Sequence, residues 1–473
     1  MPRATMVFAM VTKLCAVILA AGESTRMRSS SPKVMHRVCG RPLIAYPING
    51  AKALGADLVV VVGRGADVVR NAVGQETAAT FVEQSERLGT GHALLQARDA
   101  CKDASAIVVL PGDMPLISET TLRRLVDRHR ETTAAATVLT AELDDPAGYG
   151  RVLRRAGRPT AIVEHKDATP EQRGIREVCT SVYCFDSRHL WSALSRVERR
   201  NQQGEYYLTD VIGILAGDGK IVEAVNVEDP REGLGVNDRK QLAALSAVLR
   251  GRILDRLMES GVTVLDPAST YVDDTVEVGP DAVLYPGVFL EGRTTIGAGT
   301  VVGAGCHVIQ TRIADRVTLL PYCVLRESVV DEGAVLGPFC HLRPLSHVGT
   351  GAKIGNFVEL KKSRIGRGAK VPHLSYVGDA TIGAAVNVGA GTITCNYDGV
   401  SKHETVVGDG AFIGTNTSLV APVTVGEGAY VGAGSVITKD VPAGALAVTR
   451  APQAVREGWV ARRQRQRKAK EAE

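Results

Sequence analysis

The sequence contains few aromatic residues: Phe, Trp and Tyr make up 4% of its 473 residues, and only two of them are Trp. It also lacks a strong excess of one charge, because 56 Lys and Arg stand against 51 Asp and Glu. A net charge of +5 is too small to predict a nucleic-acid partner. The nine cysteines show no spacing typical of a zinc site, so we expect free thiols and a cytoplasmic protein.

The sequence has no apolar run long enough to cross a bilayer, which takes about 20 residues. The apolar start of the chain breaks at Thr12 and Lys13, and we interpret residues 1–13 as an N-terminal extension. The other end, residues 451–473, is a basic tail of the kind usually found solvated. We therefore expect no membrane insertion. The length exceeds what one hydrophobic core supports, so at least two domains are expected.

The most regular feature present is an apolar, mostly branched residue that recurs every six positions in the second half. Val407, Ile413, Leu419, Val425 and Val431 follow this period, and glycine comes directly after most of them. A period of six fits neither an amphipathic helix nor a two-sided strand. It is typical of a solenoid of short parallel strands, in which each repeat buries its apolar residue against its neighbours. The phase slips near 311–347 and 395–406, where we expect loops that project from the coils.

The first half alternates apolar runs with stretches of helical spacing. The runs predict strands at 14–22, 56–63, 77–84, 106–113 and 134–141, with helices near 42–55, 66–73, 91–101 and 118–130. This order indicates an α/β domain with a mainly parallel sheet, in which ligands bind at the carboxyl ends of the strands. Residues 238–259 have the pattern of one long helix that links the two halves.

Polar and glycine-rich segments follow the predicted strands. LAAGESTRM, residues 19–27, combines small residues with Arg26, and Lys33 comes soon after it. Backbone N–H groups and two cations suit phosphate groups. Asp113 ends another strand, where a carboxylate suits Mg²⁺. A glycine-rich loop alone is equally typical of an ordinary strand-to-helix turn, so the hypothesis depends on this combination.

The motifs of the first half are LAAGESTRM, SPKVMH, RLGTGHA, DPAGYGR, EHKDAT and GEYYLTD. They resemble those of the sugar-phosphate nucleotidyltransferases over about residues 14–240. With the hexapeptide repeats behind them, they resemble the bifunctional bacterial enzymes of UDP-N-acetylglucosamine synthesis. The resemblance implies that the C-terminal domain acetylates glucosamine-1-phosphate with acetyl-CoA. The N-terminal domain would transfer UMP from UTP to N-acetylglucosamine-1-phosphate and release pyrophosphate, which supplies peptidoglycan and lipopolysaccharide precursors.

The resemblance also implies roles for residues of the first domain. Mg²⁺ would be held by Asp113 and Asn237. Two positions depart from the family: Ser24 stands where a second glycine is usual, and Cys179 replaces an asparagine. The residues that would bind UTP or UDP-N-acetylglucosamine are Leu19, Ala20, Ala21, Gly22, Arg26, Lys33, Gln84, Gly89, Thr90, Gly112, Gly150, Glu164, Cys179 and Asn237.

The second domain resembles the left-handed parallel β-helix of the hexapeptide-repeat acyltransferases over roughly residues 263–450. PHLSY, residues 372–376, and CNYDG, residues 395–399, interrupt its repeat with polar groups. By this resemblance His373 would be the catalytic general base, and solenoids of this kind usually form homotrimers. The residues for glucosamine-1-phosphate would be Arg343, Lys361, Tyr376, Asn387 and Asn396, and those for acetyl-CoA would be Ala390, Tyr397, Thr415, Ala433 and Arg450.

We therefore predict an extension at 1–13, a uridylyltransferase domain at 14–237, a linker helix at 238–259, an acetyltransferase β-helix at 260–450 and a basic tail at 451–473. Three other interpretations stay open. The β-helix could serve only to assemble a single-activity nucleotidyltransferase. It could be a zinc-dependent hydratase that uses His341, His347, His373 and His403. The chain could also be a non-enzymatic scaffold.

Overall fold

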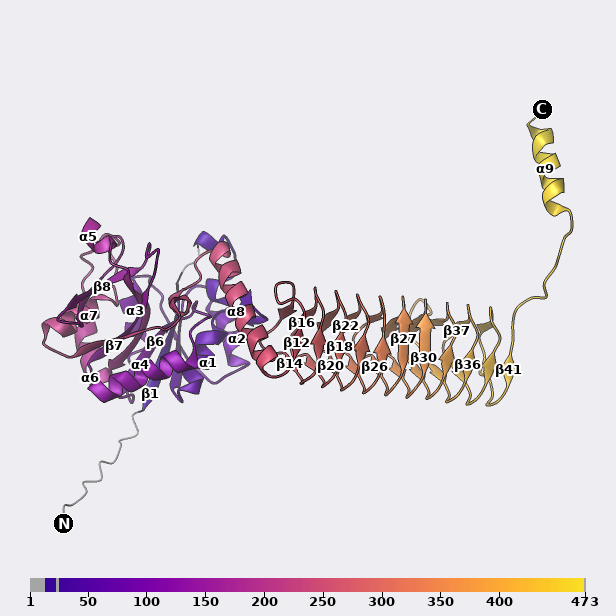
Figure 1. Ribbon diagram of the computed structural model, residues 1–473, viewed down its shortest axis with the longest axis horizontal. Coiled ribbons are helices and arrows are strands. Elements are labelled where there is room, and N and C mark those ends of the chain that lie inside the picture. The colour runs from indigo at the N-terminus through magenta and orange to yellow at the C-terminus, as the bar shows by residue number, and fades with distance from the viewer. Residues whose placement is uncertain (1–12, 23–24, 472–473) are drawn as a thin grey trace, which may run out of the picture. The chain divides into compact units, whose positions relative to one another are not determined.

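The computed structural model describes residues 13–22 and 25–471. Most of the predicted N-terminal extension, and the departure at Ser24, therefore lie outside the described residues. The chain divides into two compact units between Ile253 and Leu254: an α/β unit followed by a β-helix (Figure 1). None of the described helices is both long enough and apolar enough to cross a membrane.

The first unit is built on a nine-stranded sheet of order β11-β7-β10-β6-β1-β4-β5, to which the β8–β9 hairpin is joined through β10. Strand β10 runs antiparallel to β6 and β7, whereas β1, β4, β5 and β6 are mutually parallel. The strand bounds are β1 Leu14–Ala20, β4 Asp57–Val62, β5 Thr80–Glu83, β6 Ala106–Pro111, β7 Ala136–Glu142, β8 Gly150–Arg155, β9 Arg158–Val163, β10 Glu177–Asp186 and β11 Val222–Asn226. The five predicted strands are confirmed, and β8 to β11 were missed.

Helices cover both faces of this sheet. Their bounds are α1 Ala45–Ala53, α2 Ala66–Gly74, α3 Thr90–Gln96, α4 Glu119–Thr132, α5 Pro170–Arg173, α6 Ser187–Leu194, α7 Asp210–Gly217 and α8 Arg239–Glu259. Helix α4 is capped by Ser118, whose side chain accepts a hydrogen bond from the Thr121 amide. The prediction of a helix at 91–101 was too long. Beyond Gln96 the Ala97 and Arg98 amides bond three residues back, so the chain continues as turns.

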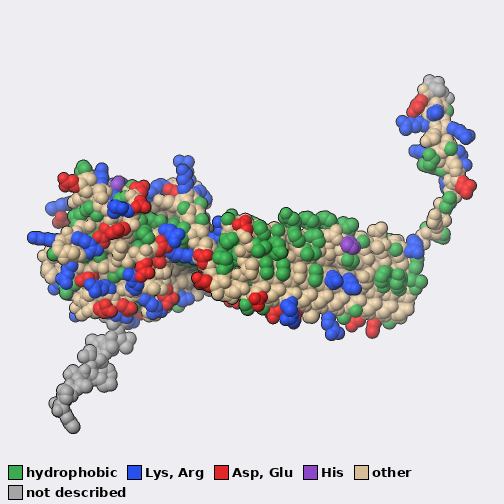
Figure 2. Space-filling model, in the orientation of Figure 1, with side chains coloured by type: hydrophobic (Ala, Val, Ile, Leu, Met, Phe, Trp, Pro, Cys, Tyr) green, Lys and Arg blue, Asp and Glu red, His purple; other side chains and the backbone are tan. Residues whose placement is uncertain are grey.

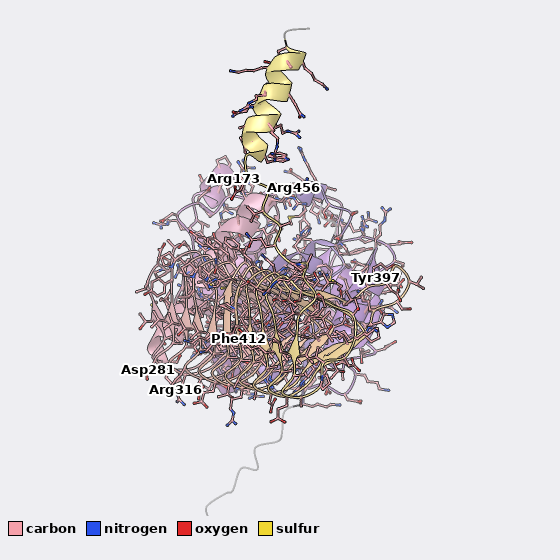
Figure 3. All side chains as sticks on the ribbon, turned by 90° about the vertical axis from the view of Figure 1, so that its right-hand side faces the viewer. Arg173, Asp281, Arg316, Tyr397, Phe412 and Arg456 are labelled. Atoms are coloured by element: carbon pink, nitrogen blue, oxygen red, sulfur yellow. The ribbon has the colours of Figure 1, made fainter. Side chains whose placement is uncertain are left out.

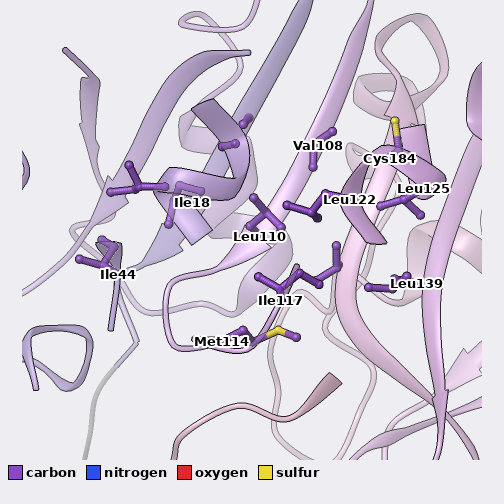
Figure 4. Close-up of a cluster of buried hydrophobic side chains, with 14 of the residues drawn as sticks. Ile18, Ile44, Val108, Leu110, Met114, Ile117, Leu122, Leu125, Leu139 and Cys184 are labelled. Carbon is purple, nitrogen blue, oxygen red and sulfur yellow. The ribbon is translucent and has the colours of Figure 1, made fainter. Parts of the chain in front are cut away.

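The core of the first unit lies on both faces of the sheet. On one face Ile18 and Leu110 pack with Met114, Leu122 and Leu125 (Figure 4). The alternate residues of the same strands, such as Val17 and Val109, join a second cluster on the opposite face. Burial on both faces explains why the central strands read as continuous apolar runs. The carboxyl ends of β1 and β6 lie side by side, because Leu19 pairs with Pro111.

The second unit is a solenoid whose coils contribute to three parallel sheets of 11, 10 and 9 strands. Its strands run from β12, Thr263–Val264, to β41, Leu446–Ala447, and most have two or three residues. The branched residue of each hexad points inward: Leu284, Leu290, Val302 and Val431, for example, are buried. The predicted β-helix is therefore confirmed. The basic tail includes an exposed helix, α9 Trp459–Lys470.

Only one of the two phase slips is a projecting loop. Val283 pairs with Val301, and Val301 pairs in turn with Thr318, so the second of these coils is one residue shorter than the first. The slip near 311–347 therefore arises because corners lose one residue, and the prediction of a loop there was wrong. In contrast, Asn387 pairs with Phe412, so this coil is several residues longer than its neighbours. The additional residues form a loop at 396–404 that carries Tyr397.

Two candidate active sites

The first candidate site joins three distant segments of the first unit. The Lys33 ammonium donates to Oδ2 of Asp113 and lies 3.2 Å from Oδ1 of Asn237. Lys33 belongs to the short 3-10 helix η2, Lys33–Met35, whereas Asp113 follows β6 and Asn237 precedes α8. The Lys33 and Asp113 side chains are only 15% and 16% exposed. The sequence-predicted residues Lys33, Asp113 and Asn237 are thus brought together, with two oxygens directed at one cationic point.

The loop before β8 reaches the same place. Burial raises the pKa of Tyr149, and the negative charge of Asp113 raises it further, against a hydrogen bond with the Gly235 backbone. The carbonyl of Asp113 accepts from the Val236 amide at 3.0 Å. Sequence analysis gave Tyr149 no role of its own, although the DPAGYGR motif contains it. Tyr149 therefore connects the β8 strand to the Asp113–Asn237 region.

A second glycine-rich loop packs against the GEYYLTD segment. The Gly91 amide donates to the Tyr206 carbonyl at 2.8 Å, and the Leu208 amide donates to the Thr90 hydroxyl at 3.1 Å. Gly89 has φ +106, and a Cβ there would lie 2.6 Å from the Tyr206 carbonyl oxygen. Only glycine fits this approach. Gln84 is buried, and its amide donates to the Gly89 carbonyl at 3.1 Å.

A half-buried carboxylate lies just after β9. Burial raises the pKa of Glu164, although its hydrogen bond from the Thr209 hydroxyl, 3.1 Å long, lowers it. A Cβ at Gly150 would lie 2.9 Å from Cγ2 of Ile162 and 3.6 Å, an ordinary contact distance, from the Glu164 carboxyl group. Thr209 was missed by the sequence analysis, but it belongs to GEYYLTD. These contacts join Gly150, Glu164 and Thr209 into one polar cluster.

Cys179 belongs to the strand beside this cluster, because it pairs with Gly150 across β10 and β8. Its side chain is buried, and Sγ lies 3.1 Å from the Tyr183 hydroxyl. Burial raises the pKa of the thiol to about 12, so it is neutral at physiological pH. Cys179 therefore packs within the protein and bonds to Tyr183.

The LAAG segment, residues 19–22, spans the end of the β1 strand and lies beside the segment that carries Asp113. Ala20 and Ala21 are buried, and the Leu19 carbonyl accepts from the Gly112 amide at 2.9 Å. A Cβ at Gly22 would meet nothing within 4 Å. Arg26 follows in the 3-10 helix η1, Thr25–Met27, and its side chain is exposed. Leu19 and Gly112 are thus adjacent, whereas among the described residues no hydrogen bond or ion pair joins Arg26 to the Lys33–Asp113 pair.

The second candidate site lies on the β-helix and includes His373. Its Nδ1 lies 2.6 Å from Oδ1 of Asn356, which is the residue paired with it in the preceding coil. The pair sits at the ends of β27, Lys353–Asn356, and β30, Lys370–His373. The imidazole is exposed, so it is accessible from outside the coils.

A strip of backbone and small side chains continues from His373 along the coils. The Ala390 carbonyl accepts from the Asn416 amide at 2.7 Å, and the Thr415 carbonyl accepts from the Gly434 amide at 2.8 Å. Arg450 donates to the Ala433 carbonyl at 2.6 Å. Strand register therefore places Ala390, Thr415 and Ala433 at equivalent corners of successive coils. Tyr397 is 59% exposed in the projecting loop, on the outside of the coils in Figure 3.

A cluster of cations surrounds one buried carboxylate near Tyr376. Asp379 accepts from Lys361 at 3.0 Å and from the Asn396 amide at 2.5 Å. Burial raises the pKa of Asp379, but these two hydrogen bonds outweigh it and hold that pKa below its ordinary value. The Asn396 amide also lies 3.5 Å from the Tyr376 hydroxyl. Lys361, Tyr376 and Asn396 are therefore brought together, and Asp379 is a member that sequence analysis missed.

Two further cations lie at the edge of this cluster. The like charge of Lys361 lowers the pKa of Lys402. Lys402 comes from the projecting loop and was also missed. Arg343 is bound to Glu359 at 2.9 Å. Asn387 begins β33, Asn387–Val388, which pairs with β30.

The four histidines of the zinc interpretation do not converge. His347 bonds to Asp331 at 2.8 Å, His403 bonds to Asp398 at 2.7 Å, and His373 bonds to Asn356. Within residues 13–22 and 25–471, no group of three or more His, Cys, Asp or Glu is arranged to hold a metal. The geometry of these histidines gives the hydratase interpretation no support.

Comparison with known proteins assigns both halves. Residues 16–206 match the MobA-like NTP transferase domain, and residues 404–439 match the bacterial transferase hexapeptide repeats. The bifunctional protein GlmU of Pelotomaculum thermopropionicum is 53% identical over 453 residues, which cover 95% of this chain and 98% of that protein. The chain belongs to the GlmU family.

Other GlmU proteins give the same result. The one from Brevibacillus brevis is 50% identical over 94% of this chain and 96% of its own length, and the one from Heliobacterium modesticaldum is 49% identical over 95% and 98%. A solved UDP-glucose pyrophosphorylase covers 51% of this chain and 99% of that protein, with 18% identity and a TM-score of 0.43. As a GlmU family member the chain is a bifunctional uridylyltransferase and acetyltransferase of UDP-N-acetylglucosamine synthesis, which confirms the predicted function.

Proposed function

We propose that Lys33, Asp113 and Asn237 form the centre of uridylyl transfer. The convergence of Asp113 Oδ2 and Asn237 Oδ1 on the Lys33 ammonium supports this assignment. Two hard oxygens directed at one positive charge also fit Mg²⁺. Mg²⁺ held by Asp113 and Asn237 would neutralise charge on the phosphates of UTP. Lys33 would then turn from Asp113 to a phosphate oxygen.

The remaining residues of this unit bind and orient the two substrates. The uridine binds to the LAAG segment, Leu19–Gly22, and to the loop with Gln84, Gly89 and Thr90. The exposed Arg26 side chain binds the phosphates. Glu164 and Gly150 hold the amino sugar, with Cys179 beside Gly150, and Gly112 contributes next to Leu19. The sugar phosphate attacks the α-phosphorus in line and pyrophosphate leaves, so catalysis depends on positioning and charge.

Asp113→Ala tests this assignment. We expect uridylyl transfer to be lost, because one of two protein oxygens is removed and Lys33 loses its partner, while acetyl transfer stays at the wild-type rate. Asp103→Ala, an exposed aspartate of the same unit, is the matched control and should keep both activities. Uridylyl transfer at the wild-type rate in Asp113→Ala would remove Asp113 from the site.

For acetyl transfer, we propose that His373 is the general base. The observation that supports this is the strip of Ala390, Thr415 and Ala433, which starts at His373 and suits an extended thioester ligand. Arg450 and Tyr397 complete the acetyl-CoA contacts. Arg343, Lys361, Tyr376, Asn387 and Asn396 bind glucosamine-1-phosphate, with cations for its phosphate.

His373→Ala tests the base directly. General-base catalysis contributes about 10²–10⁴-fold, so we expect the acetyl-transfer kcat to fall by that factor. The KM for acetyl-CoA and the uridylyl activity should stay unchanged. If kcat were close to that of the wild type at saturating substrates, His373 would have no catalytic role.

We further propose a homotrimer formed through the β-helix. Figure 2 shows hydrophobic side chains gathered along one face of the solenoid. An exposed ladder at one corner includes Tyr322, Phe339 and Phe357, with ring centroids 5.3 and 5.4 Å apart, and Leu374 follows in the next coil. Leu374 is adjacent to His373, so a subunit contact here would border the acetyl-transfer site. Phe339→Asp should yield monomers in analytical ultracentrifugation, whereas Val68→Asp on α2 should not.

The division of labour follows the two units. We propose that the α/β unit with α8 carries uridylyl transfer and that the β-helix up to residue 450 carries acetyl transfer. All nine cysteines are free, which supports a reducing, cytoplasmic location. Fractionation of cells that produce the tagged chain would test the location.

A further inference from the structure

We propose that Asn356 is a positioning residue for acetyl transfer, which fixes the tautomer and the orientation of His373. This inference builds on the proposed role of His373. Oδ1 of Asn356 lies 2.6 Å from Nδ1 of His373, and no other hydrogen bond of the imidazole is found among the described residues. When Nδ1–H donates to Oδ1, Nε2 keeps its lone pair and can accept a proton.

The backbone around Asn356 is built for this contact. In the 11-stranded sheet of the β-helix, β27 and β30 have four residues each and are drawn as the widest arrows in Figure 1. All the remaining strands of this sheet have two residues. The extension adds one register pair, Asn356 with His373, at the corner of the coil. Elsewhere in the sheet the strands end before this position. The longer ladder therefore holds these two side chains one above the other.

Gly355 makes the extension possible. A Cβ at Gly355 would overlap the carbonyl of Pro372, which is the residue before His373. Because a main-chain carbonyl cannot rotate away, any larger residue would push the two coils apart at this corner. Glycine thus allows the close approach that brings Asn356 beneath the imidazole.

The chemical step defines what the tautomer contributes. The amine of glucosamine-1-phosphate attacks the thioester carbonyl, a C–N bond forms and the C–S bond breaks. The amine proton passes to Nε2 of His373, and the departing thiolate of coenzyme A takes it up. An imidazole with hydrogen on Nε2 has no lone pair at that atom. Loss of Asn356 would allow this tautomer and free rotation of the ring.

Charged residues also stand on the two strands that carry the pair and on the adjacent strand. Lys353 and Lys370 stand at the starts of the same two strands, three residues before the pair, and Glu359 begins the adjacent strand β28, Glu359–Lys361, in register with Tyr376. Glu359 is already bound to Arg343. Asn356 is therefore the group that faces the imidazole directly, and Lys353 serves as a control on the same strand.

The test compares Asn356→Ala, Asn356→Asp and Lys353→Ala in the full chain. We expect Asn356→Ala to lower the acetyl-transfer kcat about 10–100-fold, the range for partners that orient a histidine in metal sites. Its KM for acetyl-CoA, its melting temperature and its uridylyl activity should not change. Asn356→Asp should retain most of kcat, because a carboxylate accepts the same bond. Lys353→Ala should behave like the wild type.

The pH–rate profile separates orientation from a structural role. In Asn356→Asp the acidic limb should move to higher pH, because a carboxylate beside Nδ1–H favours the imidazolium form. Wild-type kcat in Asn356→Ala would overturn the inference, as would equal losses in both variants with lowered melting temperatures. If His373→Ala were fully active, the proposed base itself would fail, which is a different result from an inert Asn356.

Discussion

Replacing Gly89 with alanine should disrupt the first site without touching the second. Gly89 has φ +106 and ψ 176, a backbone conformation that is almost restricted to glycine. A Cβ would lie 2.6 Å from the Tyr206 carbonyl oxygen and 2.9 Å from the Tyr206 nitrogen. Both atoms are main-chain atoms in the segment that bonds to Gly91. The loop and the 205–208 segment would therefore have to separate.

The cost of this separation has two parts. The backbone strain amounts to about 1–3 kcal/mol, and overpacking costs about 1–3 kcal/mol more. A total of about 2–6 kcal/mol lowers the melting temperature of a unit of this size by roughly 4–24 °C. Because Gln84 bonds to the Gly89 carbonyl, uridylyl transfer should be lost in the same variant.

Scanning calorimetry with and without UTP measures this effect, since UTP raises the melting temperature of the unit that binds it. Gly74→Ala is the matched control: Gly74 ends α2, and a Cβ there would meet nothing within 4 Å. It should melt like the wild type or slightly higher. If Gly89→Ala kept the UTP-sensitive transition and full uridylyl activity, the account of this loop would be refuted.

Two further predictions concern the first unit. Because burial raises the pKa of Glu164 above 4.5, its folded form prefers the proton, so its contribution to stability is greatest below about pH 4.5 and declines as pH rises through the raised pKa. Glu164→Gln should therefore have a higher melting temperature than the wild type at pH 8 and the same melting temperature at pH 4, and it should lose uridylyl transfer. Melting curves identical to those of the wild type at both pH values would contradict the argument that burial raises this pKa. A fragment of residues 1–259 should keep uridylyl transfer, whereas a fragment of residues 1–238, which lacks α8, should lose most of it. Helix α8 supports the site because the Asn237 backbone amide donates to Gln241 at 2.7 Å and Arg252 donates to the Leu116 carbonyl at 2.6 Å. Equal activity of the two fragments, measured as pyrophosphate release, would show that α8 does not support the site.

Much of the fold could be predicted because its signals are local. The hexad of Val407 to Val431 gave the β-helix, and the continuous apolar run of β1 gave the parallel sheet. The slip near 311–347 led to a wrong prediction of a loop. A corner that loses one residue shifts the phase of the six-residue repeat just as a projecting loop does. Strands β8 and β9 were missed, since Gly150–Arg155 and Arg158–Val163 carry exposed arginines rather than a continuous apolar run.

Proposed site residues that stand in a motif are easier to find from the sequence than the residues that contact them. His373 and Asp113 stand in recognisable stretches, and the sequence indicated both. Asn356 contacts His373 only because the length of this coil brings the two into register, which no local pattern around Asn356 reveals. Thr209 likewise meets Glu164 through the packing of α7 beside β9. Such partners depend on tertiary register, which the sequence expresses only weakly.

The most direct test of a bifunctional chain is a combined assay on one purified protein. The wild type should convert glucosamine-1-phosphate, acetyl-CoA and UTP into UDP-N-acetylglucosamine. Asp113→Ala should stop at N-acetylglucosamine-1-phosphate. His373→Ala should give UDP-N-acetylglucosamine only when N-acetylglucosamine-1-phosphate is supplied. A wild-type chain that performs only one of the two steps, or variants that lose both steps together, would contradict the assignment of separate sites.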